Sequence, residues 1–94
     1  MKSYVSVGEK YEKYSSLELE LLDITTSKIT SFRDKETLMV EYPTDLIEKT
    51  IGKIQEGDIL VVEQIDGKIV EVYSKDEEEK QRRIELLESI MKKI

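Results

Sequence analysis

The chain has 94 residues, which suits one small domain with an appendage. Hydrophobic residues make up 38% of it and charged residues another 38%, so most of the charge must lie on a solvated surface. It contains no Cys and no His, and this excludes a disulfide framework, a thiolate nucleophile and a zinc site.

No stretch approaches the roughly twenty apolar residues that a membrane span needs, and the N-terminus lacks the basic and apolar segments of a secretory signal. We therefore expect a cytoplasmic protein without a membrane partner. The absence of Cys and Asn, together with abundant Lys and Glu, is typical of thermophile proteins.

The net charge of −6 is unevenly distributed along the chain. Residues 1–16 carry +1, residues 17–73 carry −7 from six basic and thirteen acidic side chains, and residues 74–94 are neutral. A surface as acidic as that of residues 17–73 repels phosphate groups at long range. This charge disfavours general nucleic-acid binding.

The first half of the chain predicts three short strands. Residues 17–21 alternate strictly between Leu and Glu, the pattern of a strand with one buried face. A weaker strand follows over residues 29–32, and the polar residues 33–36 predict a turn. Residues 37–42 predict the third strand, which the only proline, Pro43, brings to an end.

The second half predicts a short helix and a hairpin. Thr44 or Asp45 can cap a helix that runs to a C-terminal glycine, Gly52. The apolar run 59–64 predicts a central strand, and Asp66-Gly67 predicts a two-residue type I′ turn into a last strand over residues 68–73. Five strands with a helix before the fourth predict a small OB-like barrel over residues 17–73, with SH3-like barrels and small meanders as alternatives.

Residues 74–94 predict an amphipathic helix. Ser74 and Glu77 have the spacing of a capping box, acidic residues follow at the positive end of the helix dipole, and Lys92 and Lys93 stand at the negative end. The apolar side chains occur only in its second half, after a charged first half. The expected fold is therefore α+β and mostly β, a five-stranded OB-like barrel with a C-terminal amphipathic helix.

Residues 1–16 are expected to form an N-terminal extension. If this segment is helical, its tyrosines share one face and could stack nucleic-acid bases, as single-strand-binding barrels do. Together with two basic residues they make up the candidate nucleic-acid site Tyr4, Tyr11, Tyr14, Arg33 and Lys35. Packing of the tyrosines on the barrel or on the other helix is the favoured alternative, because the β domain is acidic.

The sequence contains no recognisable catalytic constellation. We find no GxGxxG, P-loop, Ser-elbow or EF-hand pattern, and no carboxylate stands alone within an apolar run where burial would raise its pKa. We therefore expect no enzyme, no catalytic residues, no metal site and no cofactor.

Three stretches resemble a small prokaryotic family, the domain of unknown function numbered three-thousand-and-six. They are residues 56–60, residues 66–70, and the acidic-to-Arg run over residues 76–84 that leads into an apolar helix end. The resemblance covers roughly residues 29–94. Residues 1–24 and the helical insert 44–52 depart from the family pattern. Because the family has no assigned activity, the resemblance implies an accessory domain and no site residues.

The terminal helix carries the main functional hypothesis. At about 1.5 Å per residue it would run about 30 Å, comparable to the diameter of a domain of this size. Its apolar half either completes the core or reaches another chain or the N-terminal segment, and the sequence leaves these alternatives open. We expect a non-enzymatic interaction module that binds a protein partner or self-associates, with single-stranded nucleic-acid binding as the alternative. The candidate partner-binding residues are Ile84, Leu87, Ile90, Met91 and Ile94.

Overall fold

A computed structural model gives the arrangement of the chain and describes residues 1–24 and 36–92. Within them run β1 (Lys2–Tyr11), β2 (Tyr14–Glu20), β3 (Thr37–Pro43), α1 (Thr44–Ile51), β4 (Ile59–Ile65), β5 (Lys68–Lys75) and α2 (Glu77–Met91). The protein is α+β and mostly β with a C-terminal helix, as the sequence predicts.

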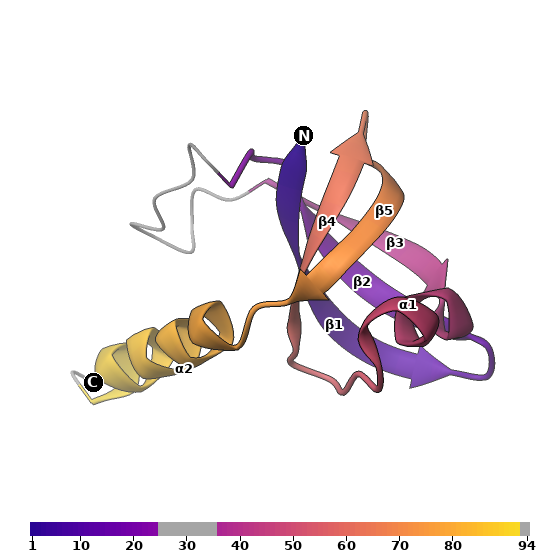
Figure 1. Ribbon diagram of the computed structural model, residues 1–94. Coiled ribbons are helices and arrows are strands. Elements are labelled where there is room, and N and C mark those ends of the chain that lie inside the picture. Colours follow the sequence, from indigo (N-terminus) through magenta and orange to yellow (C-terminus); the bar gives the residue numbers. More distant parts are fainter. Residues whose placement is uncertain (25–35, 93–94) are drawn as a thin grey trace.

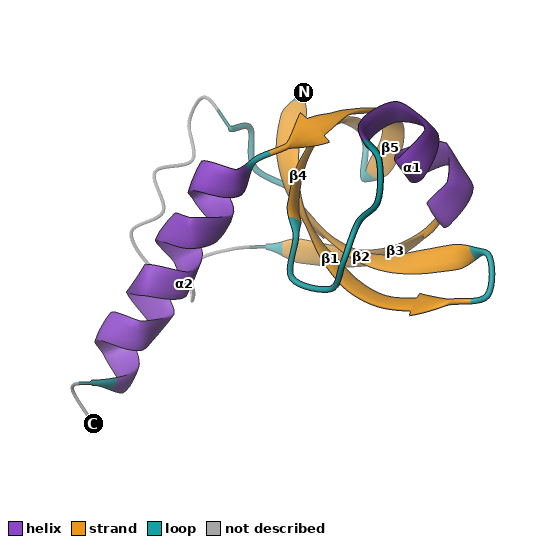
Figure 2. Cartoon of the chain, turned by 60° about the horizontal axis from the view of Figure 1, so that its bottom comes forward, coloured by secondary structure: helices purple, strands orange, loops and turns teal. Residues whose placement is uncertain are grey.

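The five strands form one antiparallel sheet in the order β3-β2-β1-β4-β5. β1 lies at the centre of this sheet, with β2 on one side and β4 on the other (Figure 1). β3 and β5 are the two edges, and no ladder joins them in the described part of the chain. The sheet curls strongly (Figure 2) but is not closed into a barrel.

The centre of the core lies between β1 and β2. Val5 and Val7 of β1 pair in register with Leu19 and Leu17 of β2, and all four side chains are at most 2% exposed. Cross-strand apolar pairs of this kind are the main stabilising contacts of a sheet. The prediction that residues 1–16 form an extension is therefore wrong, because most of them belong to the two strands at the middle of the sheet.

The connection between β2 and β3 contains two predicted elements that the structure does not describe. The strand expected over residues 29–32 and most of the turn expected over residues 33–36 lie outside the described residues. β3 itself is confirmed, and its ladder with β2 runs from Thr37 opposite Glu20 to Pro43 opposite Tyr14.

α1 is confirmed, but its N-terminal cap differs from the prediction. Pro43 occupies the N-cap position without a side-chain hydrogen bond, so neither Thr44 nor Asp45 caps the helix. The Thr44 hydroxyl lies instead 2.6 Å from that of Ser15, in a buried hydrogen bond to β2. Gly52 ends the helix with a positive φ of 83°, a conformation that favours glycine. α1 buries Ile47 and lies at one end of the curled sheet (Figure 2).

The β4–β5 hairpin is also confirmed. Asp66 and Gly67 both have positive φ, as a type I′ turn requires, and the Gln64 side-chain oxygen accepts a hydrogen bond from the Gly67 backbone N–H. A Cβ on Gly67 would lie 3.1 Å from Leu38 of β3, so the turn closely approaches the opposite edge of the sheet. Val40, Tyr42 and Ile69 partly line a hollow of about 250 Å³ between these two edges.

α2 begins two residues later than a Ser74 cap would place it. Ser74 still pairs with Val61 in the β4–β5 ladder, and the Asp76 backbone N–H donates to the Ile59 carbonyl, so β5 extends past Ser74. Asp76 is the N-cap, and its carboxylate accepts a hydrogen bond from the Glu79 backbone N–H at 3.0 Å. From this cap α2 extends away from the sheet (Figure 1), and the molecule measures 40 Å along its longest axis.

Candidate interaction site on the terminal helix

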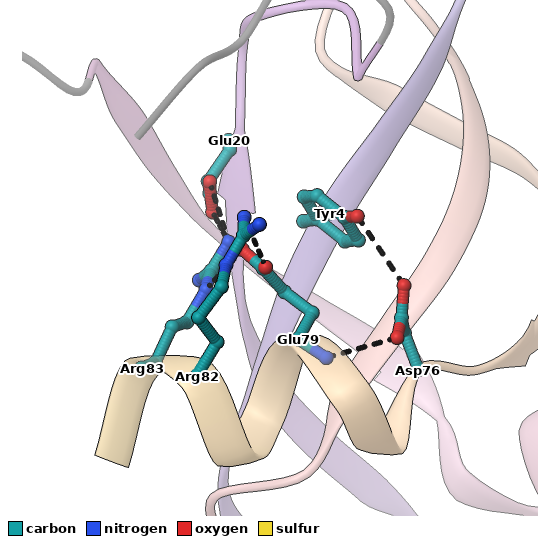
Figure 3. Close-up of polar contacts among 6 residues, drawn as sticks. All are labelled: Tyr4, Glu20, Asp76, Glu79, Arg82 and Arg83. Carbon is teal, nitrogen blue, oxygen red and sulfur yellow. Dashed lines mark hydrogen bonds and ion pairs between the residues drawn. The ribbon is translucent and has the colours of Figure 1, made fainter. Parts of the chain in front are cut away.

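The first turns of α2 are fixed to the sheet by an ion-pair network around Arg83. Its guanidinium donates to both carboxylate oxygens of Glu20, at 2.8 and 3.1 Å, and to Glu79 at 3.0 Å (Figure 3). The three side chains are only 11%, 9% and 3% exposed. Charge-assisted bonds shielded from water in this way hold α2 in a defined orientation.

Tyr4 lies beneath the same arginine. The Arg83 guanidinium carbon is 5.1 Å from the centre of the Tyr4 ring, within the range of a cation–π contact. The Tyr4 hydroxyl donates to Asp76, the cap of α2, at 3.2 Å (Figure 3). Burial, together with the neighbouring charges of Asp76 and Glu79, raises the pKa of Tyr4 above 10.0. Tyr4 thus joins the central strand to the helix.

Lys80 makes the second attachment. Its ammonium donates to Asp58 at 2.8 Å, and the other Asp58 oxygen accepts from the Gln55 backbone N–H at 2.8 Å. Burial alone would raise the pKa of Asp58, but the bonds from Lys80 and Gln55 and the charge of Lys75 outweigh it, so this pKa lies below 3.8. The hydrogen bond to Asp58 raises the pKa of Lys80 above 10.5, although burial opposes the change.

These opposite shifts predict the pH range over which the Asp58–Lys80 pair stabilises the fold. The Asp58 contribution is fully present above about pH 4 and is lost as pH falls through its lowered pKa, whereas the Lys80 contribution is lost only above about pH 10.5. In urea unfolding, Asp58→Asn should therefore be less stable than the wild type at about pH 6, by a margin that shrinks towards about pH 3. A margin that stays constant between these pH values would contradict this assignment.

We call the contacts of α2 with the sheet the anchor of α2, which consists of Tyr4, Glu20, Asp58, Asp76, Glu79, Lys80 and Arg83. Beyond it, α2 carries apolar side chains that remain accessible to water. We call these the apolar face: Ile84 at 39% exposure, Leu87 at 49%, Ile90 at 46% and Met91 at 70%. Four of the five predicted partner-binding residues therefore lie exposed on one helix, and the fifth, Ile94, lies outside the described residues.

The apolar face continues the side of α2 that points at the sheet. At about 100° per residue, Leu87 and Met91 lie within about 20° of the direction of Lys80, which reaches Asp58. The helix, however, has left the sheet by that point (Figure 2). The surface that would complete a core in a compact domain is therefore directed past the end of the β domain.

The predicted nucleic-acid residues that the structure describes, Tyr4, Tyr11 and Tyr14, are not brought together as a platform. β1 is a strand, so the shared helical face expected for its tyrosines does not exist, and Tyr4 is occupied by the anchor of α2. Tyr11 and Tyr14 pair at the far end of the β1–β2 hairpin, where a hydrogen bond to Glu41 raises the pKa of Tyr11 to about 12. Arg33 and Lys35 lie outside the described residues. Nucleic-acid binding stays an untested prediction.

Two features are not found in the described part of the chain. Among residues 1–24 and 36–92, no group of three or more carboxylates is arranged to hold a metal ion. No helix in the same ranges is long and apolar enough to cross a membrane.

Comparison with protein-family models, with curated proteins and with solved structures finds no match. The resemblance to the domain of unknown function numbered three-thousand-and-six therefore stays a prediction. In the structure, the region it covers lacks β1 and β2, which include the central strand of the sheet and its partner.

Proposed function

We propose that this protein is a non-enzymatic interaction module, an OB-like β domain that docks a protein through the apolar face of α2. A curled five-stranded sheet with a helix between the third and fourth strands supports the OB-like assignment. The docked protein is either another polypeptide or a second copy of this chain.

The observation that carries the proposal is the exposure of the apolar face beside a buried anchor. Four large apolar side chains at 39–70% exposure follow one another along two turns of a single helix. Scattered apolar residues are ordinary on protein surfaces, but a contiguous row of this kind marks an interaction surface. The anchor of α2 holds the row in a fixed direction, which lowers the entropy lost on binding.

A charge placed in the apolar face should abolish docking, while the same charge on the opposite side of α2 should not. Leu87→Glu tests the face, and Ser89→Glu is its matched control, since residue 89 is exposed and lies about 200° further around the helix. Because a docked Leu loses most of its water contact, Leu87→Glu should weaken binding at least about tenfold.

Two measurements should be made on each full-length variant, with circular dichroism to confirm the fold. Sedimentation equilibrium reports self-association, and tagged protein in a lysate of the source cells reports a different partner. The proposal requires at least one interaction that Leu87→Glu removes and Ser89→Glu preserves. If both variants and the wild type are monomeric and retain the same proteins, the apolar face is not a docking surface.

A further inference from the structure

We infer that the occupant of the apolar face is α2 of a second copy of this chain, packed antiparallel; this inference rests on the proposed function. The second helix would lie along the row that begins with Ile84 and ends with Met91. Its direction and register follow from the spacing of the apolar residues, the position of the β domain and the charges of α2.

The apolar residues have the spacing of a helix–helix seam. Ile84, Leu87 and Met91 are separated by three and then four residues, which are the a, d and a positions of a heptad. Ile90 flanks this row at a g position, where it widens the apolar surface. A second helix with the same spacing is the simplest surface that covers such a row.

The position of the β domain selects the antiparallel arrangement. Lys80 points at the β domain from nearly the same side of α2 as the apolar face, so a partner helix must approach on that side. In a parallel pair both β domains would lie at the same end of the seam, each on the side of the other helix, and they would collide. In an antiparallel pair they lie at opposite ends.

The charges of α2 favour the same direction. In an antiparallel seam a and d positions face each other, so Leu87 of one copy lies opposite Met91 of the other and the two-fold axis is level with Ser89. Lys92 of one copy is then level with residue 86 of the other, between Glu85 and Glu88. In a parallel pair Glu85, Glu88 and Lys92 would each be level with the same residue of the other copy, so Lys92 would not be level with a glutamate.

The size of the surface sets the strength of this pairing. α2 has fifteen residues and is about 22 Å long, and only the part beyond the anchor of α2 contributes to the seam. One such helix pair buries less than the roughly 800 Å² per partner of a standard stable interface. The expected dimer is therefore weak and reversible, and it forms as the concentration is raised.

Sedimentation equilibrium over a wide concentration range tests whether a second copy binds. The mean mass of the full chain should rise from 11.0 kDa towards twice that value, with Ser89→Glu behaving like the wild type and Leu87→Glu remaining at the monomer mass. A wild type that stays monomeric throughout would overturn this inference. The proposed function would still stand if the tagged protein then captured another protein through Leu87.

Pulsed EPR distances test the antiparallel register. The chain has no Cys, so Gln81→Cys and Glu88→Cys each introduce a single site for a spin label, and the two positions lie within about 20° of each other around the helix. In the antiparallel dimer the two labels at residue 81 are about 24 Å apart along the helix axis, whereas those at residue 88 are only about 3 Å apart along it. The distance between labels at residue 81 should therefore be clearly the longer. Similar distances at both positions would indicate a parallel pair and overturn the inference.

Discussion

Replacing Arg83 with Met should lower the free energy of unfolding by about 3 to 5 kcal/mol, the usual cost of removing one partner from a buried ion pair. Met keeps much of the volume of the arginine stem but removes the charge that lies between Glu20 and Glu79, whose side chains are 9% and 3% exposed. Urea unfolding of Arg83→Met against the wild type measures the difference.

Arg82→Met is the matched control for this substitution. Arg82 also contacts Glu79, at 2.6 Å, but its side chain is 67% exposed, and ion pairs so accessible to water contribute little. We expect a loss below about 1 kcal/mol. Equal losses in the two variants would show that the buried position of Arg83 is not what holds α2 to the sheet.

Removing residues 1–12 should abolish the fold. The deletion takes away β1, which pairs with both β2 and β4, and with it the buried side chains Val5 and Val7. The remaining strands would form two separate pairs with exposed edges, and an isolated pair of strands is marginally stable at best. Circular dichroism and thermal unfolding should show no cooperative transition.

Removing residues 84–94 is the contrasting deletion. It leaves Glu79, Lys80 and Arg83 in place, so the anchor of α2 and the sheet should persist and the chain should still unfold cooperatively. A cooperative transition in the chain without residues 1–12, or its loss in the chain without residues 84–94, would contradict the division between core and docking surface described here.

The elements that could be predicted from the sequence are those with local signals. Asp66-Gly67 specifies its turn through positive φ at both residues, and Gly52 specifies the end of α1 in the same way. The alternation of Leu17 and Leu19 with Glu specifies one buried face of β2. Each of these signals depends on neighbours within a few residues, so no knowledge of the tertiary structure is needed.

β1 could not be recognised because its signal is not local. Of its three alternating buried residues only Val5 and Val7 are apolar, and Tyr4, Tyr11 and Tyr14 have a spacing that also suits a helix. The strand is specified by its partners, since Lys2–Ser6 pair with residues 59–63 of β4, more than fifty positions away. A single sequence contains no direct record of such a pairing.

The apolar face and the anchor of α2 also differ in whether neighbouring residues in the sequence specify them. The apolar face was predicted because its residues recur at helical spacing. The anchor of α2 was not, because Arg83 meets Tyr4 and Glu20 only after the sheet has formed. Ser74 and Asp76 both fit the local rule for the cap, and only the β4–β5 ladder decides between them in favour of Asp76.

The central claim is that the apolar face of α2 is covered by another molecule and not by its own β domain. The most direct test is an isotope-filtered NOE measurement on a concentrated equal mixture of labelled and unlabelled chains. We predict intermolecular contacts between the methyl groups of Leu87 and Met91. Contacts of Leu87 only with buried β-domain residues such as Leu17 or Leu60, within one chain, would contradict the account.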